Sequence, residues 1–116
     1  MEIILKNLND KLLIKVQGTV DLYSSPELRE EIQSQLKSKS FREIIIDLGE
    51  VNYIDSSGIA TLVEGLQVSG KLSKKFSLVH LTAKVRDVFS LARLEKVFTI
   101  YEDQKFDEIS KAPPEK

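Results

Sequence analysis

The chain lacks cysteine altogether and has a single histidine, His80, among its 116 residues. The absence of thiols excludes a disulfide scaffold, a cysteine nucleophile and an iron–sulfur cluster. One histidine excludes a multi-histidine metal site and leaves His80 as the sole partner available to a serine–histidine triad. We therefore expect neither a metal nor a cofactor.

The sequence also lacks an excess of charge of one sign and any long hydrophobic run. Its 17 basic and 18 acidic residues give a formal net charge of -1. General binding to nucleic acids or acidic membranes needs a strong positive excess, so we expect neither. The apolar runs fall far short of the roughly 20 residues of a membrane helix, and the N-terminus has no signal-peptide pattern. These features predict a cytoplasmic protein that does not insert into a membrane.

The apolar residues alternate between strand-like and helix-like spacing. The pattern predicts strands at 3–5, 12–16, 44–48, 76–81 and 97–101, with loops over 18–21 and 49–55. We expect a hairpin turn at 7–11 between the first two strands. Amphipathic helices between the later strands, and a short one that starts at 102–103 after the last strand, predict an α/β fold, a mixed sheet of about five strands with about four helices. The length fits a single domain, which we place at 1–111, followed by a disordered tail at 112–116.

Two of the predicted helices begin with recognisable caps. Ser25 precedes Pro26, a residue that suits the first helical position, so Ser25 is the expected cap of the first helix. Thr82 is the expected cap of the third helix. The run Ile44 to Leu48 is continuous and rich in β-branched residues, which is typical of a central strand covered on both faces.

The second helix begins with one carboxylate and two hydroxyls, in the run Asp55-Ser56-Ser57-Gly58. A helix N-terminus has unpaired N–H groups and a partial positive charge, so it accommodates a phosphate. Local spacing alone favours simple capping by Asp55 or Ser56. A helical wheel extended backwards from Ile59 puts Ser57 on the solvent side and Ser56 nearer the buried face, although a cap residue is not itself helical.

The run 44–48 followed by 51–59 resembles the signature of the STAS domain, and more narrowly that of free-standing bacterial anti-sigma factor antagonists. Segments 17–21, 85–89 and 94–98 agree with the same register. The resemblance covers nearly the whole chain up to the tail. The chain departs from the family at Ser73-Lys74, where many members have a Gly-Gly turn.

This resemblance implies a regulatory binding protein rather than an enzyme. In the family, an anti-sigma factor with serine kinase activity is bound by the unphosphorylated antagonist, which releases the sigma factor for transcription. Phosphorylation of the antagonist weakens the complex, and a serine phosphatase reverses it. Carried over by motif, Ser56 is the phosphate acceptor. Asp21, Asp55, Ser57 and Gly58 join it in the partner-binding site, with Ser57 hydrogen-bonded to backbone groups at the helix start.

Other interpretations remain open from the sequence. Asp21 could cap a turn before Ser24 instead of contacting a partner. The domain could belong to a stress-signalling assembly or a lipid-transport complex, acting by protein–protein binding. A small hydrolase would use Asp55, Ser56 and His80, although no pattern in the sequence brings His80 to Ser56. Nothing in the sequence requires more than a monomer.

Overall fold

The computed structural model describes residues 1–111, and the predicted tail at 112–116 lies outside the described residues. Strands and helices follow one another in the predicted order. The elements are β1 (Glu2–Leu8), β2 (Lys11–Val20), α1 (Ser25–Leu36), β3 (Glu43–Ile54), α2 (Ser56–Lys71), β4 (Lys75–Val79), α3 (Ala83–Leu91), β5 (Thr99–Tyr101) and α4 (Asp103–Ser110).

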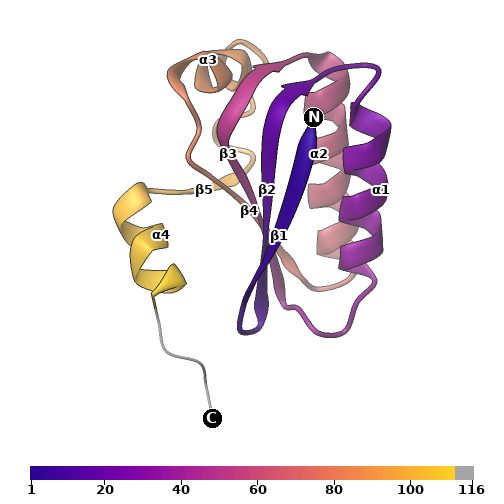
Figure 1. Ribbon diagram of the computed structural model, residues 1–116, viewed down its shortest axis with the longest axis vertical. Coiled ribbons are helices and arrows are strands. Elements are labelled where there is room, and N and C mark those ends of the chain that lie inside the picture. Colours follow the sequence, from indigo (N-terminus) through magenta and orange to yellow (C-terminus); the bar gives the residue numbers. More distant parts are fainter. Residues whose placement is uncertain (112–116) are drawn as a thin grey trace.

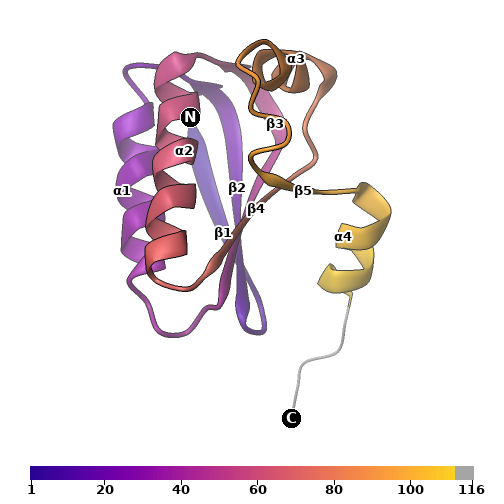
Figure 2. The same ribbon diagram turned by 180° about the vertical axis from the view of Figure 1, so that it is seen from behind.

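The five strands form one mixed sheet in the order β1-β2-β3-β4-β5 (Figure 1). β1 and β2 are an antiparallel hairpin whose turn contains Asn9 with a φ of 65°, a conformation that asparagine tolerates. The remaining neighbours pair in parallel. Helices α1 and α2 cover one face, and α4 lies on the opposite side (Figures 1 and 2). The predicted fold class is confirmed.

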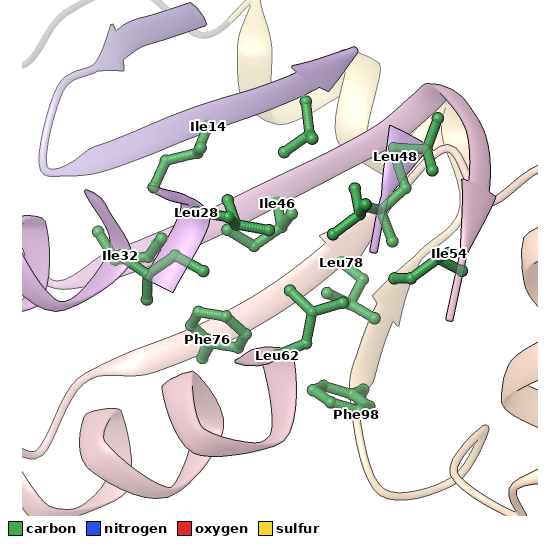
Figure 3. Close-up of a cluster of buried hydrophobic side chains, with 14 of the residues drawn as sticks. Ile14, Leu28, Ile32, Ile46, Leu48, Ile54, Leu62, Phe76, Leu78 and Phe98 are labelled. Carbon is green, nitrogen blue, oxygen red and sulfur yellow. The ribbon is translucent and has the colours of Figure 1, made fainter. Parts of the chain in front are cut away.

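The core lies between the sheet and helices α1 and α2 (Figure 3). Ile14 and Ile46 from the strands meet Leu28, Ile32 and Leu62 from the helices, and each of these side chains is fully buried. Residues Glu43 to Leu48 of β3 are all buried, as a central strand requires. A second, smaller cluster on the other face joins Leu13, Ile45 and Val79 to Phe106 of α4.

The predictions of loops at 18–21 and 49–55 are wrong for most of these residues, which belong to strands. β2 continues to Val20 and β3 to Ile54, because the two strand ends pair with each other. The pairing passes through two register irregularities, after Lys15 and after Gly18. Gly18 has a φ of 98°, so a glycine that interrupts the sequence pattern marks a bulge within the sheet and not its end.

β4 and β5 are shorter than predicted. β4 ends at Val79 because the next residue, His80, has a φ of 60°, which takes the chain out of the extended conformation. β5 begins at Thr99, since Val97 and Phe98 belong to the preceding turn.

The capping predictions have mixed outcomes. Ser24, not Ser25, is the N-cap of α1, and its hydroxyl donates to the carbonyl of Thr19 at 2.8 Å instead of capping the helix. Ser25 is the first helical residue and is buried. The Thr82 cap is confirmed, with its Oγ1 accepting from the backbone N–H of Val85 at 3.2 Å. Within residues 1–111, no helix is long and apolar enough to cross a membrane.

Candidate functional site

Asp55 connects the end of β3 to the start of α2 and caps the helix. Its Oδ1 accepts from the backbone N–H groups of Ser57 at 2.9 Å and Gly58 at 3.1 Å. These are two of the N–H groups that the first turn of a helix leaves unpaired. The capping interpretation is therefore confirmed for Asp55, and Ser56 is not needed as a cap.

The two serines differ in exposure. Ser56 is exposed, and within residues 1–111 its hydroxyl makes no hydrogen bond to the protein. Ser57 is half-buried, so the placement of the two serines by helical wheel is wrong, because the wheel does not hold at a cap. Ser57 takes part in the helix start through its backbone: its N–H donates to Asp55 and its carbonyl accepts from Thr61 Oγ1 at 3.1 Å.

The loop between β2 and α1 lies directly beside the start of α2. The backbone N–H of Leu22 donates to Asp55 Oδ2 at 3.2 Å, and the N–H of Asp55 donates to the carbonyl of Val20 at 3.1 Å. The residues immediately before and after Asp21 thus both hydrogen-bond to Asp55, the cap of α2. The fold brings together the two segments that the sequence resemblance assigned to one site.

The Asp21 carboxylate organises its own loop. Its Oδ1 accepts from the backbone N–H groups of Tyr23 and Ser24, both at 3.0 Å, and from the Ser24 hydroxyl at 3.1 Å. The bond from the Ser24 N–H is the main reason that the pKa of Asp21 lies below its ordinary value. The turn-capping role considered for Asp21 is confirmed, and a contact with a partner stays a prediction.

Gly58 is buried beneath the site. A Cβ at this position would lie 2.6 Å from Ile54 Cγ1 and 2.8 Å from Val20 Cγ1. The first turn of α2 therefore sits directly on the ends of β2 and β3 only because residue 58 has no side chain. Gly58 supports the exposed surface from below and does not line it.

A shallow groove between α2 and α3 begins at Ser56. Its volume is about 590 Å³, and apolar side chains dominate it. The lining residues are Ser56, Ile59, Ala60, Val63, Glu64, Gln67, Val88 and Ala92. The spacing of apolar residues within one helix does not reveal this groove, because the groove depends on how two separate helices pack against the sheet.

Large apolar side chains near this site are exposed. Tyr23 is 90% exposed and Leu22 is 64% exposed, in the loop that contacts Asp55. Tyr53, next to the buried Ile54 at the end of β3, is 57% exposed. Leu22 and Tyr23 were detectable from sequence, since two apolar residues stand between Asp21 and a helix start where turn residues usually lie. Neighbouring exposed apolar groups of this kind are typical of protein–protein contact surfaces.

His80 takes no part in this site. Its Nδ1 lies 3.2 Å from Asp47 Oδ1, its Nε2 lies 3.8 Å from Asp103 Oδ1, and its ring packs edge-on against Phe106. The hydrolase arrangement of Asp55, Ser56 and His80 is therefore not formed. In the part of the chain that the structure describes, no group of acidic, histidine or cysteine side chains could hold a metal ion.

The sequence matches the family model of the STAS domain over residues 2–106. The chain belongs to the STAS domain family. The match includes both loops of the site, α2, α3 and the whole sheet.

Individual relatives agree with this assignment. An anti-sigma-B factor antagonist of Staphylococcus aureus is 27% identical over 89 residues, which cover 77% of this chain and 82% of the relative. The crystal structure of an anti-sigma factor antagonist from Mycobacterium paratuberculosis superposes with a TM-score of 0.81 at 23% identity, covering 93% of this chain and 92% of that one. The Bacillus cell fate determinant SpoIIAA, in its phosphorylated form, has a TM-score of 0.71 at 16% identity, covering 92% and 97%. These structural likenesses show that the fold is shared.

Proposed function

We propose that this STAS domain is an anti-sigma factor antagonist that acts in the cytoplasm and is switched by phosphorylation of Ser56. In its unphosphorylated form it binds a cognate anti-sigma factor that has serine kinase activity, and so frees a sigma factor for transcription. The kinase transfers the γ-phosphoryl group of ATP to Ser56 Oγ, releasing ADP and the hydroxyl proton. A serine phosphatase restores the binding form.

One observation carries the proposal: Ser56 is the exposed hydroxyl at the start of α2, and its neighbour Asp55 already caps the helix. A kinase can reach this hydroxyl without breaking any hydrogen bond that holds the fold. The names of the staphylococcal relative and of the phosphorylated SpoIIAA structure support the same function.

The surface around Ser56 suits a protein partner. The apolar groove between α2 and α3 and the exposed Leu22 and Tyr23 provide contact area close to the hydroxyl. We assign Asp21, Asp55 and Ser57 to this contact region as the residues that fix its shape, with Gly58 beneath them.

Electrostatics explains how one phosphate reverses binding. A phosphate adds roughly 1.5 to 2 negative charges at pH 7, and here it joins the carboxylate of Asp55. The positive end of α2 offsets part of this charge, so the domain itself tolerates the modification. A partner packed on the groove would have to desolvate the phosphate. A loss of roughly 3 kcal/mol of binding free energy weakens such a complex about a hundredfold.

The test is phosphorylation by a candidate anti-sigma kinase with ATP, followed by intact mass measurement and peptide mapping. We expect one phosphate on Ser56, lost in Ser56→Ala and kept in the matched variant Ser57→Ala. Binding of the kinase should weaken about a hundredfold in Ser56→Asp relative to Ser56→Ala. Phosphate on Ser57, or equal affinity of the two Ser56 variants, would show that the proposed switch is wrong.

A further inference from the structure

β1 is the outermost strand of the sheet, and one of its long sides is unpaired. In the sheet of residues 1–111, β2 is its sole neighbour, and five of its seven residues are exposed (Figure 1). Ile4 and Leu5 are 46% and 42% exposed. The free side of such a strand presents unpaired N–H and C=O groups that can accept another strand.

β1 has few of the features that keep an edge strand from pairing with another chain. Its pairing with β2 is continuous over all seven residues, without a bulge that would twist the edge away. The strand contains no proline, and its two charged residues, Glu2 and Lys6, have opposite signs. The opposite edge of the sheet is different, because β5 has three residues and leads at once into α4.

We propose that β1 pairs antiparallel with β1 of a second copy of this chain, about a two-fold axis that passes beside Ile4. In this register Ile4 of one copy lies opposite Ile4 of the other. Ile3 then lies opposite Leu5, and Glu2 lies opposite Lys6, each twice because of the symmetry. Directly opposed residues share a face of the sheet, so apolar side chains meet apolar ones and both ion pairs join opposite charges.

The neighbouring registers lack this complementarity. A two-fold axis beside Leu5 places Lys6 opposite Ile4 and Glu2 opposite Leu8. An axis beside Ile3 places Glu2 opposite Ile4. Registers that place an even-numbered residue opposite an odd-numbered one are excluded. Side chains alternate between the two faces along a strand, so such a register would pair residues from opposite faces of the sheet. Charge and hydrophobicity along β1 thus select a single symmetric pairing.

The dimer leaves the candidate site accessible in both copies. Ser56 follows the end of β3, and β2 separates β3 from the pairing edge. Joining two sheets through β1 therefore produces an assembly with two exposed Ser56 hydroxyls. The pairing does not depend on the proposed function, and either proposal can fail without the other. Sequence alone suggested a monomer, and the free complementary edge is what changes that expectation.

Charge exchange tests the interface. The wild-type chain, Lys6→Glu, Glu2→Lys and the double variant are compared by sedimentation equilibrium over a wide concentration range. We expect a concentration-dependent wild-type dimer. Each single variant should dimerise about tenfold more weakly or worse, because each dimer then contains two like-charged pairs. The double variant restores both pairs and should dimerise like the wild type.

Mixing the two single variants adds a decisive comparison. Lys6→Glu carries two acidic residues on β1 and Glu2→Lys carries two basic ones, so the mixture should form a heterodimer more strongly than either variant alone. Both positions are exposed, and unfolding curves check that every variant is folded. A wild type that stays monomeric at millimolar concentration, or single variants that dimerise as well as the wild type, would overturn the proposal.

Because the chain has no cysteine, one introduced thiol reports the register. Ile4→Cys places two thiols directly opposite each other, with Cα atoms about 4.5 to 5.5 Å apart, within the range of a disulfide. The matched control Asn7→Cys is also exposed, but its two copies would be separated by about 20 Å along the strands. Mild oxidation should cross-link the first variant and not the second. Equal cross-linking of both, or none in Ile4→Cys, would contradict the assigned register.

Discussion

The backbone N–H of Leu22 donates to Asp55 Oδ2 at 3.2 Å, which ties the loop after β2 to the start of α2. The other oxygen of the same carboxylate caps the helix. Asp55 is thus shared between two segments that are 33 positions apart in the sequence. Together with the backbone bond from the Asp55 N–H to the Val20 carbonyl, this side chain fixes the exposed Ser56 relative to the exposed Leu22 and Tyr23.

Replacing Asp55 should therefore affect stability and loop order together. In Asp55→Ala the N–H groups of Ser57, Gly58 and Leu22 lose their acceptor, and we expect the free energy of unfolding to fall by about 1–2 kcal/mol. Urea denaturation measures the loss. Hydrogen exchange at the Leu22 amide should become faster.

Asp55→Asn is the matched control, because asparagine caps helices about as well as aspartate and keeps an acceptor oxygen. Its stability should stay within about 0.5 kcal/mol of the wild type. If Asp55→Ala proved as stable as Asp55→Asn, the carboxylate would not hold the two segments together.

Gly58 should not tolerate a methyl group. A Cβ there would lie 2.6 Å from Ile54 Cγ1 and 3.0 Å from the Val20 carbonyl oxygen, so Gly58→Ala forces α2 away from the sheet. We expect thermal or urea unfolding to show a destabilisation of about 1–3 kcal/mol. Gly70→Ala, later in the same helix, has nothing within 4 Å of its new Cβ and should stabilise by about 0.5–1 kcal/mol. Equal effects at the two positions would refute the packing argument.

The sequence predicted the order of elements and the sheet because the apolar periods are strong within each element. It missed the ends of β2 and β3, because Gly18 and Gly49 resemble strand breakers when each segment is considered alone. In the structure the two strand ends pair with each other, so a tertiary contact decides where each strand stops. The sequence of either segment alone does not show that the other segment will pair with it.

The candidate site was predictable only in part. Asp55 and Ser56 belong to a local motif, so the sequence identified them. Which serine is exposed depends on the extended backbone of Asp55, which a helical wheel does not represent. The groove that joins Ser56 to Val88 depends on the packing of α2 beside α3, and local spacing contains no information on that packing.

The acid dependence of stability should contain a contribution from Asp21. Three hydrogen bonds to Oδ1 favour its charged form, so the pKa of Asp21 is lower in the folded chain than in the unfolded one. Its stabilising effect is then fully present above the unfolded value of about 4 and disappears as the pH falls through the lowered pKa.

The comparison of wild type with Asp21→Asn isolates this effect, because the other carboxylates titrate alike in both. We expect the wild type to be more stable at pH 6, with the difference shrinking steadily below about pH 4. Urea unfolding at a series of pH values measures it, and a carboxyl NMR titration gives the pKa of Asp21 directly. A difference that is the same at every pH would mean that the charge of Asp21 contributes nothing.

Tyr101 should make the free energy of unfolding fall as the pH rises in the alkaline range, whereas the contribution of Asp21 is lost as the pH falls. Its hydroxyl donates to Glu43 Oε2 at 2.7 Å, beside the Ser77 hydroxyl, which donates to the same oxygen at 2.6 Å. Burial, and then the bond to Glu43, raise the pKa of Tyr101 to about 12. The stabilisation that follows from this shift is present below about pH 10, the value of an unfolded tyrosine, and is lost as the pH rises towards 12.

Tyr101→Phe removes one donor from the buried Glu43, and we expect it to destabilise the fold by about 1–2 kcal/mol at pH 8. That difference should narrow between pH 10 and pH 12, because the wild type alone loses stability as Tyr101 ionises. Tyr53→Phe is the matched control, since Tyr53 is 57% exposed and its hydroxyl has no partner within residues 1–111; its stability should change by less than about 0.5 kcal/mol. Guanidinium unfolding at each pH measures all three chains. If Tyr101→Phe changed the free energy of unfolding as little as Tyr53→Phe does, the hydrogen bond between Tyr101 and Glu43 would not contribute to stability.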